Sequence, residues 1–70
     1  MEDWQQRVVE EKAALDMKIQ RLEEFMDSEI YLTQLSEDEC SDLFEQLQVM
    51  ECYSQVLARR IDRFTDEVES

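Results

Sequence analysis

The chain has 70 residues, a formal net charge of −12, and no Gly, Pro or His. A chain of this length forms one domain, residues 1–70, whose core seldom supplies more than about 3–5 kcal/mol of net stability. The missing Gly excludes phosphate-cradling loops, the missing His excludes His-dependent catalysis and metal sites, and the acidic charge argues against DNA binding.

The first predicted element is a long helix over about residues 2–27. Acids at Glu2 and Asp3 suit the positive end of a helix dipole. Good helix formers fill most positions. Apolar residues recur at the spacing of a single helix face, and we call them the first stripe: Val8, Leu15, Ile19, Leu22 and Met26.

A second long helix is predicted over about residues 36–68. Ser36 followed by Glu39 is a capping box, which marks a helix start. The apolar pattern then runs over four heptads in steps of three and four, with Ser54 as its only polar interruption. This second stripe comprises Cys40, Leu43, Leu47, Met50, Ser54, Leu57, Ile61, Phe64 and Val68.

The short segment between the helices, residues 27–35, fixes their relative direction. A brief connection forces two consecutive helices to run antiparallel. The expected fold class is therefore all-α: an antiparallel helical hairpin of two long helices, about 2–27 and 36–68. With so small a core, we expect the hairpin to assemble into a homo-oligomer.

The second helix also carries an apolar patch on its far side, which the first helix cannot cover. Single exposed apolar residues are common on protein surfaces, but four at helical spacing form a contiguous patch. We expect this far-side patch to be the oligomer interface: Val49, Cys52, Tyr53 and Val56.

The two cysteines lie twelve residues apart, or about 18 Å along one helix, too far for a disulfide. Without CxxC spacing or a signal-peptide pattern, Cys40 and Cys52 are interpreted as small buried residues in a reducing cytosol. No apolar run approaches the roughly 20 residues that cross a bilayer. We therefore expect no metal, no cofactor, no membrane contact and no enzymatic activity.

The charge is segregated along the chain. All seven basic residues lie within residues 7–21 or 59–63, whereas residues 22–58 contain ten acids and no base. An antiparallel hairpin brings the two basic stretches together, and planar guanidinium groups suit phosphates and base stacking. The alternative is that these arginines only form surface ion pairs with neighbouring acids.

Most of the chain resembles a family of small helical phage proteins. That family includes the anti-CBASS sponges, which bind the cyclic-dinucleotide messengers made by bacterial cGAS-like enzymes. The matching residues are Gln5, Gln6, Arg7, Val8, Leu15, Lys18, Ile19, Leu22, Phe25, Leu35, Ser36, Gln46, Leu47, Met50, Tyr53, Leu57, Arg60 and Ile61.

The resemblance implies a phage anti-defence protein in the host bacterial cytoplasm. Such a protein sequesters cyclic di- and oligonucleotide messengers of CBASS immunity without hydrolysing them. It also implies a homo-oligomer, a hexamer in known sponges, with ligand pockets between protomers. The implied partners are other copies of the chain, cyclic dinucleotides and, by extension, cyclic trinucleotides.

Two ligand-binding positions carry over from the family. One is an aromatic residue near the start of the first helix, usually Tyr and here Trp4; the other is a lysine, here Lys18. They are fourteen residues apart, or about 21 Å, which is too far for one protomer to place both on one cyclic dinucleotide. The expected ligand-binding residues, from one protomer or another, are Trp4, Arg7, Lys18, Tyr53, Arg59 and Arg60.

The sequence is also consistent with two other functions. The chain could be an acidic decoy whose carboxylates imitate nucleic-acid phosphates and inhibit a host nucleic-acid-binding protein. It could also be a plain coiled-coil oligomerisation or adaptor module that binds through its far-side patch. Salt-sensitive binding to a basic protein would favour the decoy, and indifference to mutation of Lys18 would favour the adaptor.

Overall fold

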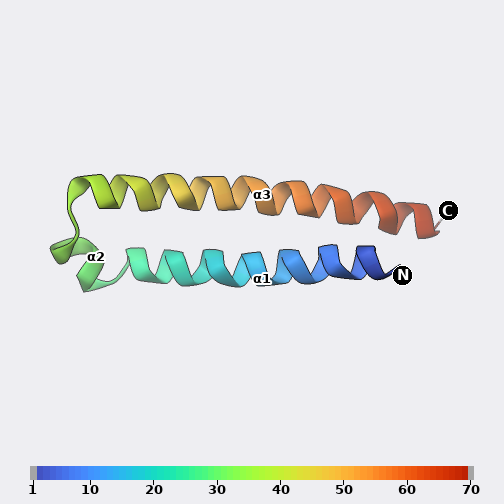
Figure 1. The fold of residues 1–70 in the computed structure, drawn as a ribbon, viewed down its shortest axis with the longest axis horizontal. Coiled ribbons are helices and arrows are strands. Elements are labelled where there is room, and N and C mark those ends of the chain that lie inside the picture. The colour runs from blue at the N-terminus through green and yellow to red at the C-terminus, as the bar shows by residue number, and fades with distance from the viewer. Residues whose placement is uncertain (1, 70) are drawn as a thin grey trace.

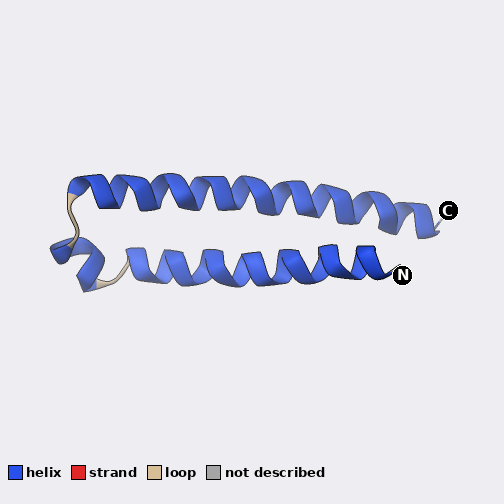
Figure 2. Ribbon diagram, viewed as in Figure 1, coloured by secondary structure: helices blue, strands red, loops and turns tan. Residues whose placement is uncertain are grey.

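The computed structural model describes the backbone of residues 2–69 and the side chains of residues 2–65. It contains three helices, α1 (Asp3–Met26), α2 (Glu29–Gln34) and α3 (Glu37–Glu69), and no strand occurs among residues 2–69 (Figure 2). α3 runs back alongside α1, with α2 at the end where the chain turns (Figure 1). The predicted all-α class and the two long helices are confirmed. The predicted stripe residue Val68 lies outside the described side chains.

Local hydrogen bonds explain where the long helices begin. The backbone N–H of Glu2 donates a hydrogen bond to Oε1 of Gln5 at 2.8 Å. Gln5 is the one buried polar residue among residues 2–65, and this bond gives its side-chain oxygen a partner. At the start of α3, the Ser36 hydroxyl accepts a hydrogen bond from the Glu39 N–H at 3.1 Å. A side-chain acceptor at this position satisfies an amide that has no partner within the helix.

Helix α2 was not predicted from the sequence. Ser28 caps it, because its hydroxyl accepts a hydrogen bond from the Tyr31 N–H at 3.3 Å. The Tyr31 ring packs edge-to-face on Phe25, with ring centroids 6.2 Å apart, and its hydroxyl donates to the Cys40 carbonyl at 3.4 Å. Tyr31 therefore connects the end of α1 to the beginning of α3.

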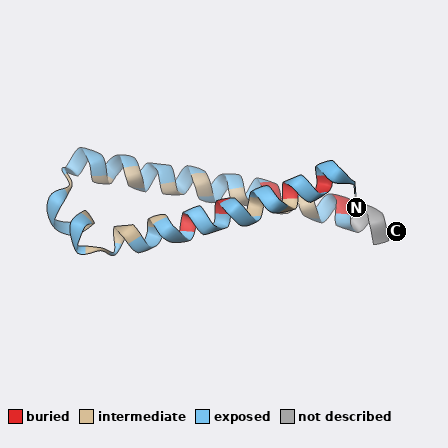
Figure 3. Cartoon of the chain, turned by 60° about the horizontal axis from the view of Figure 1, so that its bottom comes forward, coloured by how far each residue is buried: buried red, intermediate tan, exposed pale blue. Residues whose placement is uncertain are grey.

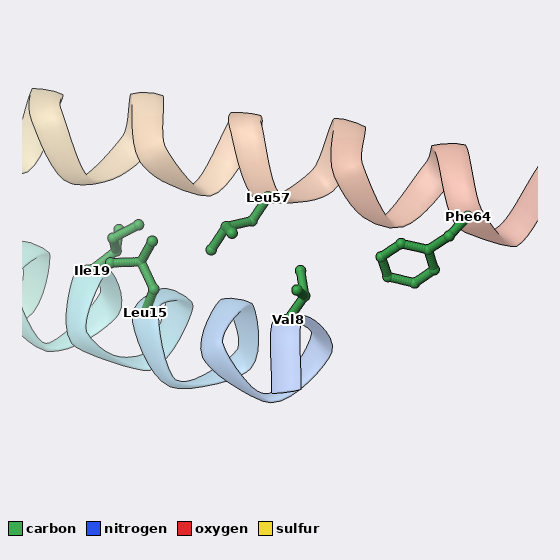
Figure 4. Close-up of a cluster of buried hydrophobic side chains, with 5 residues drawn as sticks. All are labelled: Val8, Leu15, Ile19, Leu57 and Phe64. Carbon is green, nitrogen blue, oxygen red and sulfur yellow. The ribbon is translucent and has the colours of Figure 1, made fainter. Parts of the chain in front are cut away.

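The hydrophobic core lies where the two stripes meet (Figure 4). Leu57 is completely buried, with 0% of its surface exposed. The buried cluster comprises Val8, Leu15, Ile19, Leu57 and Phe64. All five belong to the predicted stripes, so the spacing identified the core face of each long helix.

Burial is uneven along the molecule. Among residues 2–65, the buried residues lie within residues 5–19 of α1 and 57–64 of α3, and none lies at the end near the turn (Figure 3). In the half near the turn, the stripe residues of residues 20–56 are only partly buried. One helix thus shields the other incompletely over the turn-proximal half.

The molecule is a rod rather than a globule. It measures 52 × 15 × 14 Å with a radius of gyration of 15.9 Å, against about 11 Å for a compact domain of 70 residues. Its accessible surface is 5565 Å², whereas a globular monomer of this mass exposes about 4,650 Å². The chain therefore leaves a surplus of about 900 Å² in contact with solvent. None of the described helices combines the length and the hydrophobicity needed to cross a membrane.

Candidate functional site

The start of α1 meets the last turns of α3 through two aromatic rings. Trp4 packs edge-to-face on Phe64, with ring centroids 5.5 Å apart and an angle of 79° between the ring planes. Phe64 is buried because it belongs to the second stripe, but 54% of the Trp4 surface remains exposed. The indole therefore has free surface for a further contact.

A pocket of about 200 Å³ opens beside this aromatic pair. Its lining consists of Trp4, Phe64, Arg60 and Arg63. The two arginines are three residues apart on α3, a spacing that places side chains on the same helix face. The pocket thus combines an exposed indole with two guanidinium groups and suits an anion that carries a flat ring.

The lining includes two of the predicted ligand-binding residues, Trp4 and Arg60. The other four are exposed and lie outside the lining: Arg7, Lys18, Tyr53 and Arg59. Phe64 was not predicted as a ligand-binding residue, because its place in the second stripe marked it only as a core residue. Arg63 was assigned only to the basic stretch 59–63, although its spacing of three residues from Arg60 places the two arginines on the same helix face.

Lys18 cannot reach the pocket of its own chain. It lies on α1 fourteen residues from Trp4, which corresponds to about 21 Å along the helix axis. Any contact of Lys18 with a ligand in this pocket must therefore come from a second protomer.

The far-side patch of α3 is uncovered within the chain. Its four members are all exposed, and Val49 has 63% of its surface exposed. The prediction that both cysteines are buried is wrong for Cys52, which is exposed, whereas Cys40 is half-buried. Cys52 lies on the side of α3 that faces away from α1, and Cys40 lies in the second stripe.

A polar cluster that the sequence analysis missed joins α1 to α3. Lys12 pairs with Asp16 at 2.7 Å, and it also donates to the Ser54 hydroxyl at 3.2 Å. Ser54 in turn donates to Asp16 at 2.6 Å. The hydrogen bonds from Lys12 and then from Ser54 hold the pKa of Asp16 below its ordinary value of 3.8. Ser54, the one polar interruption of the second stripe, therefore makes hydrogen bonds between α3 and α1.

The described part of the chain holds no group of three or more Cys, Asp or Glu side chains arranged to hold a metal ion. The pocket beside Trp4 has two arginines in its lining. It needs no metal to bind an anion, because its own arginines supply the positive charge.

One comparison with known proteins gives a match. The model of a protein family described as Sequestin matches residues 2–63, a range that includes the whole of α1 and α2 and most of α3. No curated protein and no solved structure matches the chain.

Proposed function

The chain belongs to the Sequestin family, and from this membership we propose that it sequesters cyclic di- and oligonucleotide messengers of bacterial CBASS immunity. It acts as a phage anti-defence protein in the cytoplasm of the host and releases its ligand unchanged. The family name denotes sequestration, so it suggests binding rather than catalysis. The pocket that combines Trp4 with Arg60 and Arg63 is the observation that carries this proposal.

The chemistry of the pocket fits such a ligand. An exposed indole offers a face on which a base can stack, an interaction worth about 1–3 kcal/mol per base. Arg60 and Arg63 offer planar donors for phosphate oxygens. The net charge of −12 is no obstacle, because within one chain the pocket is lined by two positive charges and no acid.

The size of the pocket indicates that one chain provides only part of the site. Pockets that enclose a drug-sized ligand measure about 300–1,000 Å³, whereas this pocket measures about 200 Å³. We assign the missing wall to a second protomer, which can also contribute its Lys18. The surplus solvent-exposed surface and the far-side patch support a homo-oligomer, and we take its order to be the hexamer of known sponges.

Three further predicted ligand-binding residues, Arg7, Arg59 and Tyr53, lie outside the pocket lining. Arg7 follows Trp4 by three residues on α1, and Arg59 directly precedes Arg60 on α3, so both offer further guanidinium groups to the phosphates of a ligand. Tyr53 is seven residues before Arg60, about 10 Å along α3, where it can contact a ligand that extends beyond the pocket or a neighbouring protomer.

Calorimetry with a panel of cyclic di- and trinucleotides tests the proposal, with the matching linear dinucleotides as controls. We expect cyclic nucleotides to bind and to be recovered intact after the protein is denatured. Trp4→Ala and Arg60→Ala should each weaken binding about tenfold or more. Arg21→Ala removes an exposed arginine outside the pocket and should have no effect. Recovery of hydrolysed nucleotide, or no binding by any cyclic nucleotide, would overturn the proposal.

The acidic half of the rod favours a second candidate function. Residues 22–58 contain ten acids and no base, as a decoy for a nucleic-acid-binding protein requires. Under this alternative, the protein binds a basic host protein, binding falls steeply with added salt, and cyclic nucleotides do not compete. The calorimetric panel therefore separates the two functions.

A further inference from the structure

One exposed face of α3 has its charges in a regular order. Acids lie toward the N-terminal end, apolar residues in the middle and bases toward the C-terminal end. The residues follow one another in steps of three or four, so they share a helix face. We call them the α3 stripe: Asp42, Glu45, Val49, Tyr53, Val56, Arg60 and Arg63, all of which are exposed.

The α3 stripe is complementary to itself when it is reversed. Its centre lies between Cys52 and Tyr53, and the apolar residues Val49 and Val56 are equally far from that centre. Each charged residue has a counterpart of opposite sign at the same distance on the other side. Glu45 corresponds to Arg60, about 11 Å from the centre, and Asp42 corresponds to Arg63, about 16 Å from it.

We infer that two copies of the chain pair through antiparallel α3 helices along this stripe, related by a two-fold axis near residues 52 and 53. In that register, Arg60 of each copy lies level with Glu45 of the other, and Arg63 lies level with Asp42. Val49 and Val56 meet in the middle. A two-fold contact of this kind uses the same patch on both subunits.

The order of charges selects a second copy as the occupant of this face. A parallel arrangement would place acids against acids and bases against bases, which is unfavourable. The reversed copy places a residue of opposite charge beside every charged residue of the α3 stripe. The surplus surface of about 900 Å² also resembles the share of about 800 Å² that each partner buries in a standard interface.

The inferred pairing reaches beyond the far-side patch to the ligand pocket. Arg60 and Arg63 belong to the α3 stripe and also line the pocket. The second copy therefore places the N-terminal end of its α3, with Glu45 and Asp42, beside the pocket and extends its wall. A guanidinium group has five N–H donors, so each arginine can pair with a carboxylate of the second copy and still donate to a phosphate. The pairing itself needs no nucleotide, so it can hold or fail independently of the proposed function.

Charge reversal tests the register in the ligand-free protein. Glu45→Arg and Arg60→Glu should each weaken association about tenfold in sedimentation equilibrium, because each variant sets like charges opposite one another twice per dimer. The double variant should restore association. Glu51→Arg and Arg21→Glu make the same charge changes at exposed positions off the stripe and should leave association unchanged. Failure of the double variant to restore association would overturn the inferred register.

Cross-linking of the native cysteines gives a second, independent test. In the inferred register, the two copies of Cys52 are offset by about 1.5 Å along the axis, whereas the two copies of Cys40 are about 38 Å apart. A short bis-maleimide should therefore yield covalent dimers from the wild-type protein and from Cys40→Ser, but none from Cys52→Ser. Dimers that form equally through Cys40, or no dimers at all, would overturn the inference, whatever the calorimetry shows.

Discussion

The Ser54 hydroxyl donates a 2.6 Å hydrogen bond to Oδ1 of Asp16 across the contact between α3 and α1. Lys12 donates to both groups, so the three side chains form one polar cluster within an otherwise apolar contact. An apolar seam tolerates several alignments of two helices, whereas a polar group needs its partner at a fixed position. The cluster therefore fixes the register of α3 on α1.

Removal of the Ser54 hydroxyl should lower the free energy of unfolding. We expect a loss of about 1 kcal/mol for Ser54→Ala, the usual contribution of one hydrogen bond between protein groups. Urea titration followed by circular dichroism measures this loss. Ser41→Ala changes an exposed serine on the same helix and serves as the control. Equal losses in the two variants would show that the hydroxyl of Ser54 makes no specific contribution.

The same cluster gives stability a defined dependence on pH. The pKa of Asp16 is lower in the folded chain than its ordinary value of 3.8, so its contribution is fully present above that ordinary value. The contribution is lost as the pH falls through the lowered pKa. The difference in melting temperature between wild type and Asp16→Asn should therefore be constant near neutral pH and shrink below pH 3.8. A difference that grows on acidification would contradict this assignment.

Truncation of Leu57 should be the most damaging change in the core. Leu57 is completely buried, and replacement of a buried Leu by Ala costs about 2–5 kcal/mol. Leu32→Ala offers the same chemical change at a side chain that is 72% exposed, where we expect about 0.5 kcal/mol or less. Comparable urea midpoints for the two variants would argue against a core location for Leu57.

Association and ligand binding should fail together if the pocket is shared between protomers. Val56→Asp places a charge in the middle of the α3 stripe, so we expect a smaller particle in sedimentation and at least tenfold weaker nucleotide binding in calorimetry. Leu32→Asp adds the same charge at an exposed position on α2 and should change neither measurement. A dissociated variant that keeps its affinity would show that one chain forms the whole site.

The sequence predicted the features that depend on regular spacing. Steps of three and four identified both long helices and their buried faces, because that spacing places side chains on a single side of a helix. The six-residue helix α2 was not predicted, because it is too short to show the helical period of apolar residues. Its capping residue Ser28, followed by Glu29, was the available signal.

Features that depend on the alignment of two helices were not predictable in the same way. Ser54 and Asp16 are 38 residues apart in sequence, and a one-dimensional pattern does not state which residues lie level across a helix pair. The pocket likewise depends on the meeting of Trp4 with Phe64. Cys52 was placed wrongly because its small apolar side chain resembles that of a core residue.

The uneven burial along the rod implies two regions of different local stability. Around Leu57 the helices are held by buried side chains, whereas near the turn they are held by half-buried ones and by Tyr31. Backbone amides near the turn should thus exchange with deuterated solvent sooner than amides near Leu57. Opening of the turn should therefore leave intact the packing around Leu57 and the pocket beside Trp4.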